Sequence, residues 1–187
     1  MHLPFATEPR WAGWRGRYDR LDLAITSWLA RAGIVVLRLG LGFVFLWFGL
    51  LKFFPGLSPA QDLATRTIEQ LTLGAVGPDV SLPILATWES LIGLGLLSGR
   101  FLRATLFLLA VQMLGAATPL LLFPAETFTR FPHAPTLEGQ YIIKNVVLVG
   151  AAMVIGATVR GGSVVPHPAA PRDGLARPRA GRADRQD

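Results

Sequence analysis

The chain has 187 residues, of which 51% are hydrophobic, and a formal net charge of +6. Its apolar residues cluster in four long runs, which excludes an ordinary water-soluble domain and predicts a single membrane domain. It contains no cysteine, which excludes disulfides, iron–sulfur clusters and thiol chemistry within the chain. The basic residues lie in the tails and short loops beside the apolar runs, a charge bias typical of membrane topology. Nucleic acid is therefore not an expected partner.

The N-terminal segment, residues 1–31, is polar and aromatic and lacks the apolar core of a cleaved secretory signal. Over residues 18–31, apolar side chains recur at helical spacing: Leu21, Ile25, Trp28 and Leu29. We predict a short amphipathic helix that lies on the inner membrane surface and is anchored there by tryptophan.

Four apolar runs follow, and they are residues 32–54, 82–98, 104–123 and 141–159. Each is close to the length that crosses a bilayer as a helix. Pro119 is expected to bend or loosen the last turn of the third run. The sequence therefore predicts an all-α fold, an integral membrane four-helix bundle over residues 32–159. The tail, residues 160–187, is rich in Arg, Pro, Ala and Gly and is expected to be disordered.

A further short helix is predicted in the connection between the first two runs. Ser58-Pro59-Ala60-Gln61 resembles a capping box with proline at the first helical position, and Gly74 is suited to end the helix. The expected apolar face consists of Ala60, Ala64, Ile68 and Leu71. This pattern favours an amphipathic helix on the membrane surface.

The arginines predict the orientation of the bundle. Five arginines precede the first run, two lie between the second and third, and six follow the fourth, whereas the other two connections hold only Arg66 and Arg130. Positively charged connections stay in the cytoplasm, so both termini are expected there.

Several ionisable residues lie inside or at the ends of the runs, where they are costly and usually functional. Lys52 stands near the outer end of the first run, and Glu89 about a third of the way into the second. Lys144 and Asn145 open the fourth run, with Glu138 just before it. On the predicted topology all five lie in the outer third of the membrane. We therefore expect a polar pocket between the first, second and fourth helices.

The candidate roles follow from side-chain chemistry. Of the 18 basic residues only Lys52 and Lys144 are lysines, and both lie in the apolar runs. Lysine is a compact donor whose pKa falls readily on burial, so either could donate a hydrogen bond to a ligand carbonyl. Glu89 would take or give the accompanying proton, which makes Glu89 and Lys144 the catalytic candidates. The ligand-binding candidates are Lys52, Glu138, Asn145, Gln112 and Arg38.

Structural roles remain open for the same residues. A lysine or arginine near the end of a membrane helix, Arg38 included, often reaches to the interface, and a glutamate between helices often only fixes packing through an ion pair. Gln112 suits a hydrogen bond between helices. His133 has no second ligand at useful spacing, so no metal site is predicted. The glycine pairs Gly40/Gly42 and Gly93/Gly95 favour close helix approach.

The motifs resemble a known family. They are Arg38-Leu-Gly-Leu-Gly, Phe48-Gly-Leu-Leu-Lys-Phe-Phe, Glu89 within Trp-Glu-Ser-Leu-Ile-Gly-Leu-Gly, and Glu138-Gly-Gln-Tyr-Ile-Ile-Lys-Asn. Over about residues 32–158 the chain resembles the DoxX-type family, which includes DoxX and DoxD-like proteins, of small four-helix membrane proteins. The resemblance implies a bacterial inner-membrane location and, for some relatives, membership in quinone-linked sulfur-oxidation or oxidative-stress assemblies. The chain departs from a simple redox protein because it has no cysteine, histidine pair or haem ligand set.

The leading hypothesis is an accessory membrane subunit that binds a quinone-like ligand and assists the redox chemistry of a partner protein. No covalently bound cofactor is expected, and the bilayer is the first partner. Two alternatives stay open: a small transporter or ion-coupled carrier that uses the charges as a relay, and a structural scaffold whose basic tail docks a partner or anionic lipid.

Overall fold

The computed structural model describes residues 11–54, 56–58 and 61–162. The disorder predicted for the tail therefore falls almost wholly outside the described residues. The chain divides into two compact units, Met1–Ser27 with Val165–Asp187, and Trp28–Val164. The second unit holds every element except the first part of helix α1, and the candidate site lies within it.

Helix α1 runs without a break from Trp11 to Leu51. The structure thus differs from the prediction of a separate surface helix over residues 18–31, because the same helix continues into the first apolar run. No proline interrupts the sequence between residues 11 and 51, and the isolated Gly33 costs a helix only about 1 kcal/mol. The helix also ends three residues before the predicted boundary at residue 54.

Helix α2, Gln61–Leu71, is the predicted short helix. Gly74 ends this region as expected, with a φ of 82° and its N–H donating to the carbonyl of Glu69. Of the predicted apolar face, Ala60 lies outside the described residues, Ala64 and Ile68 are half-buried and Leu71 is exposed. The fully buried residues of the helix are Leu63, Thr65 and Thr67. Threonine tolerates this burial since its hydroxyl can bond to a carbonyl one turn back, as Thr67 does with Leu63 at 2.6 Å.

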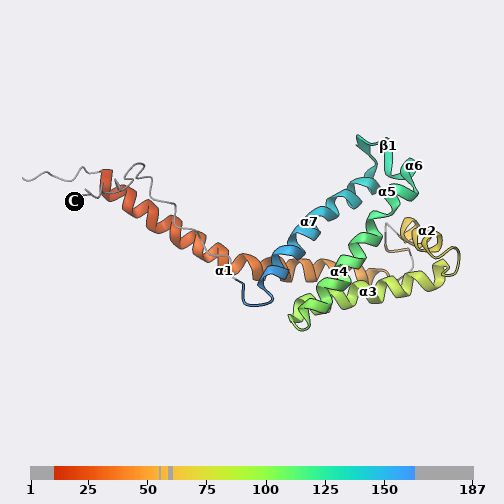
Figure 1. The fold of residues 1–187 in the computed structure, drawn as a ribbon, viewed down its shortest axis with the longest axis horizontal. Helices are drawn as coiled ribbons and strands as arrows, with labels where there is room; N and C mark the ends of the chain where they lie inside the picture. The colour runs from red at the N-terminus through yellow and green to blue at the C-terminus, as the bar shows by residue number, and fades with distance from the viewer. Residues whose placement is uncertain (1–10, 55, 59–60, 163–187) are drawn as a thin grey trace, which may run out of the picture. The chain divides into compact units, whose positions relative to one another are not determined.

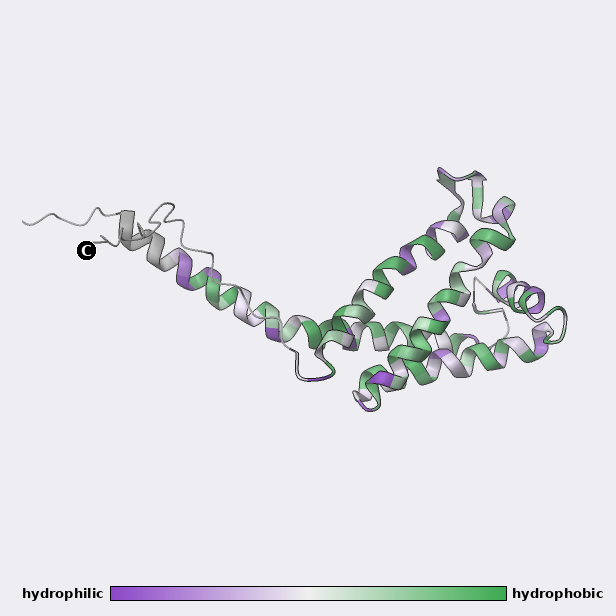
Figure 2. Cartoon of the chain, viewed as in Figure 1, coloured by the Kyte–Doolittle hydropathy of each residue, from purple (hydrophilic) through white to green (hydrophobic). Residues whose placement is uncertain are grey.

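Helix α3, Pro78–Ser98, begins four residues earlier than predicted and ends at Gly99, which adopts a left-handed φ of 69°. Helix α4 covers Leu102–Ala117, and Pro119 opens the four-residue helix α5, Pro119–Leu122, so the predicted break at this proline is confirmed. Apolar residues cover most of α3 and α4 (Figure 2).

The connection to the last helix is compact. It contains the short helix α6, Pro124–Thr127, and two antiparallel strands, β1 at Phe128–Arg130 and β2 at Ala134–Pro135. Helix α7, Leu137–Thr158, follows at once, and the Thr136 hydroxyl caps it by accepting from the N–H of Gly139. The fourth helix therefore starts four residues before its predicted boundary.

Small residues let α1 and α3 approach closely, and the ribbons of these two helices run side by side in Figure 1. A Cβ on Gly49 would lie 2.7 Å from the backbone nitrogen of Ser90, and one on Gly93 would collide with the backbone of Leu46, so α1 and α3 touch along this line. The predicted role in close packing is confirmed for Gly42, Gly93 and Gly95, whereas nothing lies within 4 Å of a Cβ on Gly40.

One apolar core joins the four long helices. Each contributes two buried side chains: Leu41 and Phe45, Ile92 and Leu96, Leu109 and Met113, Ala151 and Ile155. In the described part of the chain, four segments are long and apolar enough to cross a membrane: Tyr18–Leu51, Pro78–Ser98, Leu102–Leu122 and Leu137–Thr158. The predicted four-helix membrane fold is confirmed.

Candidate functional site

An ion pair lies between two of the long helices. Lys52 directly follows the last residue of α1, and its Nζ lies 2.6 Å from Oε2 of Glu89 on α3. The two side chains are only 10% and 11% exposed. Position 52 reaches position 89 because Gly49, one turn earlier, packs directly on Ser90. Two of the predicted site residues therefore meet.

A third helix completes this group. Gln112 on α4 donates from Nε2 to the other carboxylate oxygen of Glu89, at 3.0 Å. Next to it, the indole N–H of Trp88 donates to the carbonyl of Leu108, one turn from Gln112 on the same helix. Both oxygens of Glu89 are thus held, each from a different helix. We call Lys52, Glu89 and Gln112 the polar cluster.

The polar cluster lies deeper along α3 than predicted. Glu89 is the twelfth of the 21 residues of α3, roughly 16 Å along the helix axis from its first residue. Glu89 therefore lies near the middle of α3, whereas the prediction placed it about a third of the way in, because α3 starts at Pro78 and not at residue 82. Since Lys52 pairs with Glu89, α1 ends beside the middle of α3, and the first half of α3 extends beyond it.

A pocket of about 240 Å³ lies over the end of α1. Its lining combines the Lys52 end of the polar cluster with residues from the start of α2 and the first turns of α3: Lys52, Phe53, Gln61, Pro78, Asp79, Leu82 and Pro83. Pro83 lies inside α3 and has no N–H, so the helix cannot supply the usual donor to the carbonyl of Asp79. The pocket thus joins an ammonium, an amide and a carboxylate to apolar walls.

A second, open and mostly apolar groove of about 330 Å³ follows the outside of α3. It is lined by Pro83, Ile84, Thr87, Trp88 and Leu91, which share one face of the helix at intervals of three and four residues. Pro83 lines both the pocket and the groove. The polar pocket and the apolar groove therefore lie next to each other on α3.

The fourth span does not contribute as predicted. Lys144 and Glu138 on α7 are exposed, and Asn145 is half-buried. The Lys144 ammonium lies 5.5 Å from the ring centre of Tyr141 on its own helix, and no hydrogen bond or ion pair to Glu89 is found among the described residues. The polar cluster therefore uses the third span, through Gln112, where the prediction had the fourth.

Arg38 lies at the opposite end of α3 from the pocket. Its Nη1 donates to the carbonyl of Leu96 at 2.7 Å and to that of Leu97 at 3.4 Å. A cation at the C-terminal end of a helix satisfies free carbonyls and offsets the negative end of the helix dipole. Arg38 thus holds α1 against α3 and takes no part in the polar cluster.

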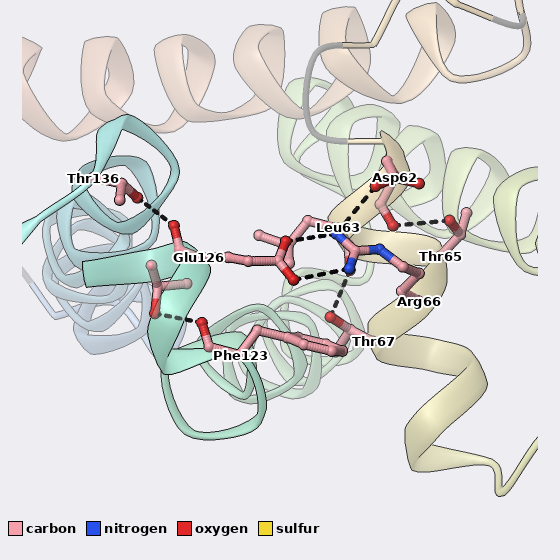
Figure 3. Close-up of polar contacts among 9 residues, drawn as sticks. Asp62, Leu63, Thr65, Arg66, Thr67, Phe123, Glu126 and Thr136 are labelled. Atoms are coloured by element: carbon pink, nitrogen blue, oxygen red, sulfur yellow. Dashed lines mark hydrogen bonds and ion pairs between the residues drawn. The ribbon is translucent and has the colours of Figure 1, made fainter. Parts of the chain in front are cut away.

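A second charged group joins two connections that are far apart in the sequence (Figure 3). Arg66 on α2 makes two hydrogen bonds to the Glu126 carboxylate on α6, at 2.8 and 2.6 Å, and a 3.0 Å ion pair with Asp62. Its guanidinium also lies 5.3 Å from the ring centre of Phe123. The hydrogen bond from Arg66 lowers the pKa of the Glu126 carboxyl below its usual value, and the same bond raises the pKa of Arg66.

Some residues of the pocket and the groove were not predicted from the sequence. Gln61 was noted only within a capping box and Trp88 only within a motif, and Asp79 was not singled out. One signal pointed to this end of α3: a proline inside a membrane helix, Pro83, frees a backbone carbonyl and often marks a functional position. The Arg66–Glu126 ion pair joins two connections that are far apart in the sequence, so no local sequence pattern predicted it.

The fold and the polar cluster together define a multi-pass α-helical membrane protein with a polar group held between its spans. Residues 33–123 match the DoxX family model, which supports the DoxX-type family assignment that the motifs indicated. The matched region includes Lys52, Glu89 and Gln112 but ends before Glu138 and Lys144. Comparisons with curated proteins and with solved structures gave no significant match.

Proposed function

We propose that the protein is an accessory subunit of the bacterial inner membrane that binds a quinone-like ligand at the Lys52 pocket and supports redox chemistry in a partner protein. The observation that carries this proposal is the polar cluster: three side chains from three helices meet inside an apolar domain, and one of them, Lys52, also lines a pocket. Polar groups placed in this way are costly and commonly serve a ligand.

The pocket fits the head of such a ligand. An ammonium has three N–H donors, and within the described part of the chain Lys52 uses two of them, one for Glu89 and a weaker one for the carbonyl of Phe48 at 3.4 Å. In the proposal the third binds a carbonyl oxygen of the ligand. The pocket volume of about 240 Å³ suits a single substituted ring, since sites for larger ligands measure roughly 300–1,000 Å³. The adjoining groove would take an apolar tail.

The side chains also suit the proton chemistry. A bound quinone accepts two electrons and two protons, and the proposal places the electron donor in a partner protein. The positive charge of Lys52 would stabilise negative charge that develops on the carbonyl oxygen. The Lys52 ammonium would give one proton to that oxygen and Glu89, held in place by Gln112, would take up a proton from water and return it to Lys52. The second proton would reach the other quinone oxygen from water at the open side of the pocket.

An ion-coupled carrier needs a polar path on both sides of its site. Along α3, the buried residues between Glu89 and the Arg38 end include Ile92 and Leu96, which pack in the apolar core of all four long helices. This core closes the route past the polar cluster. The geometry therefore favours ligand binding from one side over transport across the membrane.

Quinone titration in nanodiscs tests the proposal. Quenching of the tryptophan fluorescence by decylubiquinone should report binding, since Trp88 lines the groove. Lys52→Met should weaken the affinity roughly tenfold or more, because a charge-assisted hydrogen bond contributes about 1.5–3 kcal/mol. In cells, Glu89→Gln should lower survival under oxidants at an unchanged amount of membrane-inserted protein.

The matched control is Glu69→Gln, which removes an exposed carboxylate of α2 that does not line the pocket. It should leave affinity and survival at the wild-type level. Correctly inserted Lys52→Met protein that binds the quinone as tightly as the wild type would overturn the proposal.

A further inference from the structure

Helix α2 lies beside the Lys52 pocket and covers part of it. Because α1 ends beside the middle of α3, the space along the first half of α3 is occupied by α2, which packs against α3 (Figure 1). The first residue of α2, Gln61, forms a wall of the pocket together with Lys52. Leu82, which also lines the pocket, is only 8% exposed. A ligand that reaches this pocket therefore passes the edge of α2.

The buried face of α2 is weakly apolar. Leu63 is the single large apolar side chain that the described part of this helix buries, beside Thr65 and Thr67. Both threonine hydroxyls bond to carbonyls of α2 itself, those of Asp62 and Leu63, and so need no partner outside the helix. Moving α2 would therefore break few hydrogen bonds and expose little apolar surface, which makes other attachments important.

The strongest polar contact of α2 with the rest of the chain is the bidentate ion pair between Arg66 and Glu126. Exposed ion pairs are usually weak, but bidentate arginine–carboxylate pairs are the exception. Glu126 itself is well fixed, since its backbone carbonyl accepts from the Thr136 hydroxyl at 2.7 Å, next to the start of α7. Arg66 thus ties a weakly packed helix to the connection between the last two spans (Figure 3).

We infer that α2 is a lid over the Lys52 pocket and that the Arg66–Glu126 link is the latch that regulates access to it. This inference rests on the proposed function for the identity of the ligand, but opening of the lid can be measured without any ligand. When the latch is closed, Gln61 and Leu82 stay together at the pocket wall. When it opens, α2 moves away from α3 and exposes the pocket.

Cysteine labelling tests the latch directly, because the natural chain contains no cysteine. Leu82→Cys places a thiol on the buried pocket wall, and its reaction rate with a charged maleimide in nanodiscs reports opening. Arg66→Gln and Glu126→Gln should each raise this rate roughly two- to fivefold. The double variant should label no faster than either single variant, because both changes remove the same link.

Val80→Cys is the matched control, since Val80 lies on the same helix, is 56% exposed and does not line the pocket. Its labelling rate should not change with the latch variants. High salt should raise the Leu82→Cys rate when the latch is intact and have no effect in Arg66→Gln. Unchanged Leu82→Cys labelling in both single variants, or an equal rise at Val80→Cys, would overturn the latch. Either result would leave the quinone titration as a separate test of the ligand.

Discussion

The Lys52–Glu89 pair illustrates how a charged residue is accommodated among apolar helices. Breaking a buried pair by removing one partner typically costs about 3–5 kcal/mol, because the remaining charge is left uncompensated. Here the carboxylate has a second donor in Gln112, and the ammonium has a pocket beside it. A pair that served packing alone would not need an open space at its lysine, and this pocket favours a ligand.

Acidity should release the Arg66–Glu126 latch. The pKa of Glu126 is lower in the folded protein than its ordinary value of 4.5, mainly because Arg66 donates to its carboxylate. The resulting stabilisation is fully present above pH 4.5 and is lost as the pH falls through the lowered pKa. Wild type should therefore melt above Glu126→Gln from pH 5 to 7, and the two thermal midpoints should converge at lower pH.

The same comparison in an Arg66→Gln background supplies the control. Without the guanidinium, Glu126→Gln should shift the thermal midpoint equally at every pH. A pH-dependent difference that persists in that background would show that another group, and not Arg66, sets the behaviour of Glu126.

At the residue level the sequence supported Lys52 and Glu89, because ionisable residues inside apolar runs are rare. It also raised Gln112, and the hydrogen bond between helices suggested for it is present. Lys144 was grouped with Lys52 and Glu89 by predicted membrane depth, but it does not join the polar cluster. Depth in the membrane does not determine which face of a helix a residue occupies. That information depends on helix packing, which the sequence pattern does not contain.

Among the elements, the contact between α1 and α3 should be the most sensitive to small changes. Gly93→Ala would place a Cβ against the backbone of Leu46, which cannot rotate away. We expect a loss of about 1–3 kcal/mol in the free energy of unfolding, measured by SDS titration in mixed micelles.

Gly150→Ala on α7 provides the comparison. A Cβ at this position meets nothing within 4 Å. Because alanine favours helix over glycine, the variant should be as stable as the wild type or slightly more stable. Equal losses in both variants would argue against close α1–α3 packing.

The existence and order of the four long helices were predictable from hydropathy alone. Their ends were not, because Pro78 and the Thr136 cap extend α3 and α7 through polar residues that hydropathy assigns to loops. The uninterrupted α1 was missed for a related reason. Polar residues before residue 32 indicated a surface helix, although nothing in the backbone chemistry breaks the helix there.

For the whole molecule, the polar cluster lies where three spans meet, and the pocket lies beside it, between the end of α1, the start of α2 and the first turns of α3. The fourth span, α7, packs against α4 and joins the common core through Ala151 and Ile155, but contributes no residue to the polar cluster. The regions that hold the cluster and pocket, Lys52 to Gln112, also fall within the part that matches the DoxX family. This agreement supports a site of the first three spans.

Photolabelling with an azido-quinone, followed by peptide mapping, tests the location of the ligand most directly. We expect saturable labelling, displaced by decylubiquinone, in peptides that contain Lys52 and Phe53 or the Pro83–Leu91 face of α3. Saturable labelling confined to α7 around Lys144, or labelling that decylubiquinone does not displace, would contradict it.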